Sequence, residues 1–135
     1  MSQPEFKAKL VLEAVVSPSE DAGKVSQAMK NVLGDARCDA SVSPGSARLT
    51  TEDPRALLHI RDQLRDRHVR SAARRQMLLS ISGRSTSLML NRQAAAAGVI
   101  ALCGSPEESP LGPIHLTMHS ETIDAAIDWL TAYAG

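Results

Sequence analysis

A strict alternation of apolar and polar residues near the start of the chain constrains its fold more than any other feature. Within residues 5–16, every second side chain is apolar: Phe6, Ala8, Leu10, Leu12 and Ala14. The intervening positions carry lysine, glutamate and valine. Side chains on a β-strand point alternately to opposite faces, so the pattern predicts a strand with one buried face. We therefore expect a sheet that helices cover on one side.

The rest of the chain supplies alternating strand and helix patterns. Apolar residues at helical spacing predict helices over residues 22–33, 54–68 and 71–79 and after Ser120. Strands are predicted near residues 36–42, 47–51, 85–91, 99–103 and 114–119, with a helical corner at 91–95. The wholly apolar segment 99–103 is expected to be a central strand, and 114–119 an edge or half-buried strand. The order β-α-β-β-α-α-β-β-β-α predicts an α+β fold, with a largely antiparallel sheet and helices packed on one face.

Length and composition favour a single domain over residues 1–135. One Phe, one Trp and one Tyr make base stacking on aromatic side chains a weak binding mode. The longest apolar run, residues 94–103, is about half of the ~20 residues that a membrane helix needs. Two cysteines, Cys38 and Cys103, make no disulfide framework and are expected to be buried small apolar residues. We expect a soluble cytoplasmic protein.

Charge is distributed unevenly along a chain whose formal net charge is zero. Residues 54–92 hold nine arginines, no lysine and two acids, a net charge of +7. Residues 1–53 hold six bases and eight acids, and residues 93–135 hold five acids and no base. This asymmetry is the main functional signal of the sequence.

The arginines of the predicted helices are candidate nucleic-acid contacts. On a helix, Arg61, Arg65 and His68 lie on adjoining turns, as do Arg67, Arg70 and Arg74, with Arg75 beside them. Arginine matches phosphate oxygens in a two-pronged geometry, and a basic face binds nucleic acid with a steep salt dependence. Alternatively, the arginines form ion pairs along the helix or with the acidic C-terminal helix, within one chain or across a dimer.

Other polar motifs give weaker signals. Asn91, Arg92 and Gln93 either contact phosphate or base edges, or tie the corner to backbone groups, and the sequence favours neither. His115 and His119 would lie roughly 13 Å apart on one face of a strand, too far for one metal ion. We find no paired carboxylates, nucleophile–base set or nucleotide fingerprint. The sequence therefore predicts no enzyme, no metal and no cofactor.

Several motifs together resemble uncharacterised protein family 0201 of archaea. They lie at residues 16–20, 64–74, 90–95, 108–114 and 128–130, and residues 91–95 and 109–114 (Asn-Arg-Gln-Ala-Ala and Ser-Pro-Leu-Gly-Pro-Ile) are specific as a pair. The resemblance implies membership of a wider RNA-binding and exosome-related group. It also implies a homodimer and a fold similar to the ribosomal protein that holds 5S ribosomal RNA.

The leading hypothesis is a non-catalytic module that contacts the backbone of structured RNA, ribosomal RNA among the candidates. Its contacts would be the arginine set together with His68, Asn91 and Gln93. The alternative is a dimeric protein–protein interaction or structural module whose arginines form intersubunit ion pairs. Exposed arginines at the junction of two helices serve either function, so the sequence alone does not separate them.

Overall fold

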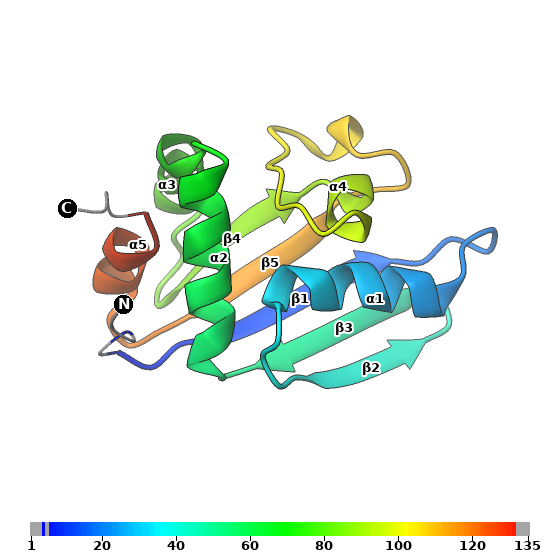
Figure 1. The fold of residues 1–135 in the computed structure, drawn as a ribbon, viewed down its shortest axis with the longest axis horizontal. Coiled ribbons are helices and arrows are strands. Elements are labelled where there is room, and N and C mark those ends of the chain that lie inside the picture. The colour runs from blue at the N-terminus through cyan, green and yellow to red at the C-terminus, as the bar shows by residue number, and fades with distance from the viewer. Residues whose placement is uncertain (1–3, 5, 132–135) are drawn as a thin grey trace.

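The computed structural model describes residue 4 and residues 6–131. Within these residues, five strands form one antiparallel sheet in the order β2-β3-β1-β5-β4 (Figure 1). The strands are β1 (Lys9–Val15), β2 (Asp39–Ser43), β3 (Ser46–Thr51), β4 (Ser85–Leu90) and β5 (Ile114–His119). The α+β class predicted from the sequence is confirmed.

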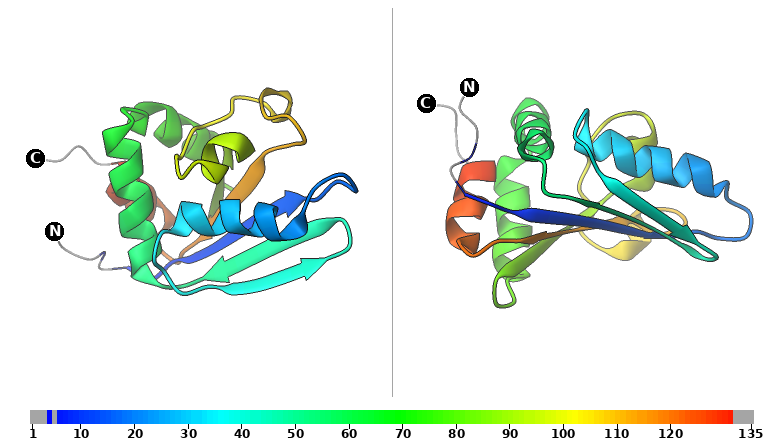
Figure 2. Two further views of the ribbon diagram at one scale, coloured as in Figure 1. Left: turned by 45° about the vertical axis from the view of Figure 1, so that its right-hand side comes forward. Right: turned by 90° about the horizontal axis from the view of Figure 1, so that it is seen from below.

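Helices cover one face of this sheet, as the alternation in the first strand predicts. They are α1 (Ala22–Leu33), α2 (Pro54–Asp66), α3 (Arg70–Leu79), the short α4 (Arg92–Ala96) and α5 (Ile123–Thr131). The right-hand view of Figure 2 shows α1 and α2 on the same side of the sheet. No helix among the described residues is long and apolar enough to cross a membrane.

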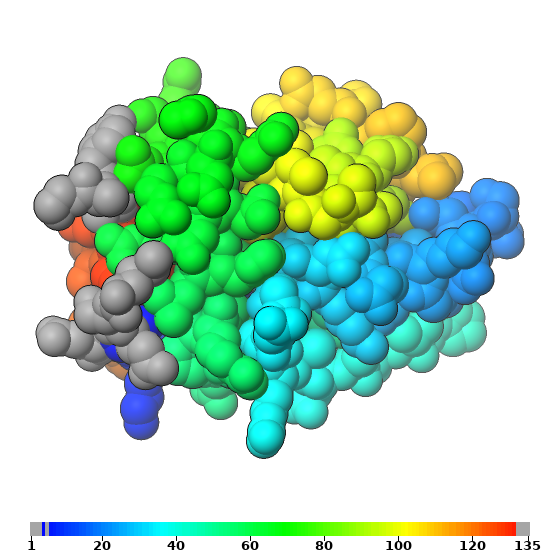
Figure 3. All heavy atoms as spheres, in the orientation of Figure 1, coloured from blue at the N-terminus to red at the C-terminus, as the bar shows by residue number. Residues whose placement is uncertain are grey.

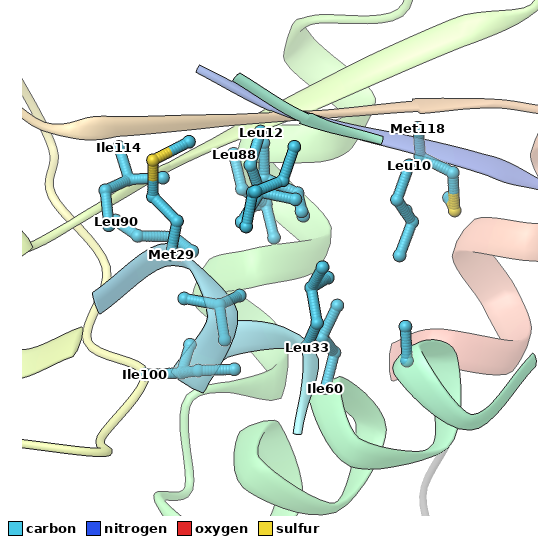
Figure 4. Packing of buried hydrophobic residues seen from close by; sticks show 14 of the residues in the cluster. Leu10, Leu12, Met29, Leu33, Ile60, Leu88, Leu90, Ile100, Ile114 and Met118 are labelled. Carbon is cyan, nitrogen blue, oxygen red and sulfur yellow. The ribbon is translucent and has the colours of Figure 1, made fainter. Parts of the chain in front are cut away.

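One continuous apolar core lies between the sheet and the helices. Leu10, Leu12 and Met118 point from the sheet toward Leu33 and Ile60 on α1 and α2 (Figure 4). Burying one such leucine contributes about 2 kcal/mol through removal of apolar surface from water. The opposite face of the sheet carries the alternate residues, and most of these are exposed.

The prediction of a central strand at residues 99–103 is wrong. This segment forms one isolated bridge, between Leu102 and Leu90, flanked by hydrogen bonds from Asn91 N to Ala101 O (2.8 Å) and from Cys103 N to Met89 O (2.9 Å). Ile100 and Cys103 are buried, but Ile100 N donates to Gln63 Oε1 on α2 at 3.3 Å. The apolar run therefore packs at the end of β4 instead of forming a strand.

Residues 114–119 form an interior strand, β5, which lies between β1 and β4. Its side chains alternate between buried and exposed, so the half-buried alternative is right and the edge alternative is not. The two edges of the sheet differ. Gln76 of α3 accepts a hydrogen bond from Met89 N (3.1 Å) and donates to Cys103 O (2.6 Å), which covers part of the β4 edge. All five residues of β2 are exposed, and among the described residues this strand pairs only with β3.

Candidate nucleic-acid interface

Local sequence signals position α2 much as predicted. Asp53 caps the helix, since its Oδ1 accepts from Arg55 N at 3.0 Å, and Pro54 occupies the first turn. The buried stripe consists of Ala56, Leu57, Ile60 and Leu64, while Leu58 is only half-buried. The arginines of α2 are therefore held on the flanks of the helix, away from its buried stripe.

The chain changes direction between α2 and α3 at His68. This residue has a φ of 56°, in the left-handed region that few residues other than glycine adopt. Arg67 N still donates to Gln63 O (2.9 Å), and Val69 N donates to Leu64 O (3.1 Å). Helix α3 then begins at Arg70, and Val69 provides no side-chain cap for it. The first-turn N–H groups of α3 thus lie next to a run of basic residues.

At least five arginines of the basic segment form ion pairs inside the chain. Arg55 pairs with Asp53 at 2.8 Å, and Arg65 pairs with Asp66 at 3.2 Å and Asp62 at 3.5 Å. Three further pairs are Arg74–Asp128 (2.6 Å), Arg84–Glu121 (2.7 Å) and Arg92–Glu20 (2.7 Å). Hydrogen bonds from the Arg55 side chain, from Arg37 N and from Arg55 N hold the pKa of Asp53 well below its usual range.

Two arginines contact the acidic C-terminal helix, within the same chain. Arg74 Nη1 reaches Asp128 Oδ1 and also donates to Thr131 Oγ1 at 3.3 Å. The guanidinium of Arg61 lies 4.5 Å from the ring centroid of Trp129, a cation–π arrangement. These contacts correspond to the ion-network alternative for part of the arginine set.

Arg92, a predicted RNA contact, does not form part of the surface. Its side chain is 6% exposed, and Nη1 donates to both carboxylate oxygens of Glu20, at 2.7 and 2.8 Å. Burial acts to raise the pKa of Glu20, but hydrogen bonds from Ser17 N and from Arg92 outweigh it, so this pKa is lowered. Burial keeps phosphate away from this guanidinium, so we remove Arg92 from the candidate interface.

The neighbours of Arg92 also make internal contacts. Asn91 caps α4, because its Oδ1 accepts from Ala94 N at 2.9 Å. Gln93 Nε2 donates to Pro110 O at 3.4 Å. Of the two roles that the sequence leaves open for these residues, the structure shows the one in which they tie the corner to backbone groups.

The surface that remains is formed by Arg67, His68, Arg70 and Arg75, which we call the α2–α3 corner. Arg67, His68 and Arg75 are exposed, and no carboxylate of the described residues lies within ion-pair distance of them. Arg70 is half-buried. Figure 3 shows side chains of the α2–α3 segment, in green, projecting from the molecule. The α2–α3 corner thus holds three of the seven arginines that are predicted to contact nucleic acid.

The two cysteines have different environments. Cys103 is buried, and burial followed by the negative charge of Glu108 raises the pKa of its thiol. Cys38 is half-buried and packs against the core. The expectation of a buried apolar role fits Cys103 better than Cys38.

One polar site was not predicted from the sequence. A cavity of about 260 Å³ that is wide open to solvent lies where β1 and β4 begin and β5 ends, and its lining includes Lys7, Lys9, Arg84 and His119. Strand register places Lys9 directly opposite His119. Alternation shows which face each residue occupies but does not show which strands are neighbours, so no sequence signal could have joined these four.

Comparison with known proteins identifies relatives over most of the chain. No protein-family model matches it. A UPF0201 protein of Sulfurisphaera tokodaii is 36% identical over 126 residues, which are 91% of this chain and 86% of the relative. A UPF0201 protein of Sulfolobus acidocaldarius is 35% identical over the same shares of the two chains.

Solved structures agree in fold. The crystal structure of a UPF0201 protein from Methanococcus jannaschii has a TM-score of 0.77 at 21% identity, covering 94% of this chain and 95% of that one. A DUF54 protein from Methanothermobacter thermautotrophicus has a TM-score of 0.65 at 19% identity, over 93% and 96% of the two chains. At these identities the likeness concerns the fold alone. The sequence relatives, however, are close enough to show that the chain belongs to the UPF0201 protein family of archaea.

Proposed function

We propose that this chain is a non-catalytic RNA-binding module that contacts the backbone of structured RNA through the α2–α3 corner. The observation that supports it is the exposure of Arg67, His68 and Arg75 without a carboxylate partner among the described residues. Exposed guanidinium groups offer paired donors that fit phosphate oxygens.

Neighbouring ion pairs can extend this surface at little cost. The side chains of Arg65 and Arg74 are 37% and 44% exposed in their pairs. Exposed pairs of this kind contribute only about 0–1 kcal/mol, so a phosphate can replace the carboxylate. Helix α3 adds a further favourable element, because its N-terminal end carries partial positive charge and has no side-chain cap.

The described aromatic residues favour backbone contacts over base stacking. Phe6 and Trp129 pack edge to face at a centroid distance of 5.8 Å, and Arg61 occupies a face of Trp129. Reading of single-stranded bases depends on accessible aromatic faces. We therefore propose recognition of phosphates and helical shape, with ribosomal RNA among the candidate ligands.

The test compares two double variants that remove the same charge. Arg67→Gln/Arg75→Gln removes two corner arginines, and Arg37→Gln/Arg48→Gln removes two exposed arginines that lie outside both proposed binding sites. Binding to a 5S ribosomal RNA transcript is measured by filter retention across a salt series. For the corner variant, affinity should fall and the slope of log K against log salt should flatten by roughly 0.7–0.9 for each phosphate that the variant no longer neutralises.

The control variant should keep most of the affinity and the slope of the parent protein. Both variants should melt close to the parent, since exposed substitutions usually change stability by no more than about 0.5 kcal/mol. Equal losses in the two variants would indicate a general charge effect without a defined interface. Absence of RNA binding by the parent protein at low salt would exclude the proposal.

Self-association is a second candidate, and the exposed edge of β2 favours it. The register of β2 with β3 places Ala40 and Val42 on the helix side of the sheet, and Asp39, Ser41 and Ser43 on the other side. Two antiparallel copies of β2 centred on Ser41 would pair Ala40 with Val42 and Asp39 with Ser43 of the other copy. No like charges would face each other, and two sheets would join into one. This candidate assigns the dimer to β2 instead of to the arginines, most of which have partners within the chain.

A further inference from the structure

The cavity at the end of the sheet is basic and lies apart from the α2–α3 corner. Its lining comes from the segment before and at the start of β1, the residue after β3, the start of β4 with the turn before it, the end of β5 and the residues before α5. The ionisable side chains in this lining are Lys7, Lys9, Arg84, His119, Glu52 and Glu121. Neither the arginine surface nor the core explains why four basic residues gather here.

Strand register brings two of the basic groups together. His119 lies opposite Lys9 on one side and opposite Ser85 on the other, so all three side chains share the uncovered face of the sheet. Directly opposed residues have Cβ atoms about 5 Å apart. Lys9 and His119 are both exposed, so an ammonium group and an imidazole can reach the same small ligand.

Hydrogen bonds hold the floor and the rim of the cavity in place. The buried Ser120 donates from Oγ to Lys7 O at 2.9 Å, and Ser120 N donates to Arg84 O at 2.9 Å. Ser82 and Ser85 exchange backbone hydrogen bonds of 2.9 and 3.1 Å across the turn that carries Arg84. Hydrogen bonds thus join the backbone before β1, the backbone after β5 and the turn before β4 at one site.

Among the described residues, the lysines of the cavity have no ionic partner. Arg84 and Glu121 neutralise each other in an exposed pair at 2.7 Å. Lys7 and Lys9 form no ion pair with the described carboxylates, although Glu52 also lines the cavity. Two ammonium groups and the imidazole of His119 therefore face one carboxylate. Unpaired cations over a fixed polar floor favour an anion with several acceptor oxygens.

We propose that this cavity binds a phosphate group through Lys7, Lys9 and His119, with Arg84 at its rim. A tetrahedral phosphate offers acceptors in several directions and so suits donors that approach from β1, from β5 and from the turn before β4. The phosphate can belong to a small molecule or to an RNA backbone. The site goes beyond the proposed RNA surface and stands even if the α2–α3 corner binds no RNA.

The test follows the ring-proton NMR signals of the four histidines while inorganic phosphate replaces chloride at constant ionic strength. The His119 signal should shift and saturate with a dissociation constant of about 1–10 mM. His115, on the same face of β5 but opposite Glu13, serves as an internal control and should not saturate with it. Lys9→Gln should weaken binding about fivefold, whereas Lys24→Gln on α1 should leave it unchanged.

Parallel, non-saturating shifts of His115 and His119 would overturn the proposal, and so would unchanged binding by Lys9→Gln. Two further measurements identify the source of the phosphate. Competition by a 5S ribosomal RNA transcript would assign the site to backbone phosphates. Binding of inorganic phosphate that the RNA does not displace would assign it to a small phosphorylated molecule.

Discussion

Arg92 and Glu20 form a buried ion pair between residues 72 positions apart in the sequence. Both carboxylate oxygens accept from the same guanidinium nitrogen, and the two side chains are only 6% and 11% exposed. Within the described residues, Arg92 Nε and Nη2 are buried and have no hydrogen-bond partner. The pair thus fastens the segment before α1 to α4, and among these residues the guanidinium has Glu20 as its only ionic partner.

Removal of one member of this pair should therefore be costly. Glu20→Gln leaves a buried cation without a carboxylate, and loss of one partner of a buried pair typically costs about 3–5 kcal/mol. Because Glu20 retains some solvent contact, we expect Glu20→Gln to lower the free energy of unfolding, measured with urea, by about 3 kcal/mol. The double variant Glu20→Gln/Arg92→Met should recover part of this loss, since it removes the stranded charge. A Glu20→Gln protein as stable as the parent would show that the pair is not structurally required.

Local patterns were sufficient for the elements that they define by themselves. The alternation around Leu10 and Leu12 predicted the face of β1, and the helical spacing of apolar residues within 54–68 predicted α2. These signals succeed because they depend on neighbours one to four residues away. The segment 99–103 misled the prediction because a short apolar run fits any buried position, whether or not its backbone pairs with a strand.

The candidate site depended on information that no local pattern contains. Arg74 meets Asp128, 54 residues later, and Arg92 meets Glu20, 72 residues earlier. The charge excess of the segment was visible, but which arginines are neutralised depends on tertiary contacts. The sequence could therefore locate a basic surface within residues 54–92 but could not separate its exposed members from its structural ones.

The cap residue Asp53 predicts a specific loss of stability in acid. Its pKa is depressed in the folded protein below the unfolded value of about 4. The ionised carboxylate therefore stabilises the fold above about pH 4, and this contribution disappears as the pH falls through the folded pKa. Asp53→Asn keeps a capping oxygen but not the charge, so it should be less stable than the parent by about 1 kcal/mol at pH 7.

The difference between the parent and Asp53→Asn should narrow as the pH is lowered from 5 to 2 in urea unfolding experiments. Asp66→Asn is the control, because its exposed carboxylate pairs only at the surface with Arg65. Asp66→Asn should change the free energy of unfolding by no more than about 0.5 kcal/mol. If the difference in unfolding free energy between the parent and Asp53→Asn is the same at neutral and acid pH, the role assigned to the charge of Asp53 is contradicted.

Gly34 ends α1 in a conformation that only glycine adopts easily. Its φ is 66° with ψ at −133°, and an added Cβ would lie 2.8 Å from Cγ of His59. Gly34→Ala should therefore cost about 2 kcal/mol, from backbone strain together with the contact with the imidazole. Gly45→Ala is a comparison without the steric contact, because its φ is also positive but no atom lies within 4 Å of the added Cβ.

Thermal unfolding of Gly34→Ala in an His59→Ala background should show a smaller loss than in the parent background. The difference measures the steric part of the penalty. If Gly34→Ala and Gly45→Ala are equally mild, the contact between Gly34 and His59 is not as tight as the structure indicates.

The exposed edge strand supports a final prediction, which concerns assembly. Val42 is 50% exposed on the helix side of β2, where pairing of two β2 strands would place it next to Ala40 of the second copy. Light scattering at micromolar concentration should report twice the mass of one chain for the parent protein. Val42→Lys should shift the mass toward the monomer, since a lysine on an edge strand opposes pairing with another edge.

Val15→Lys is the matched control, because Val15 is 66% exposed on β1 and no edge pairing involves it. A parent protein that is monomeric at every concentration would exclude the dimer, and a dimer that survives Val42→Lys would assign the interface to another surface.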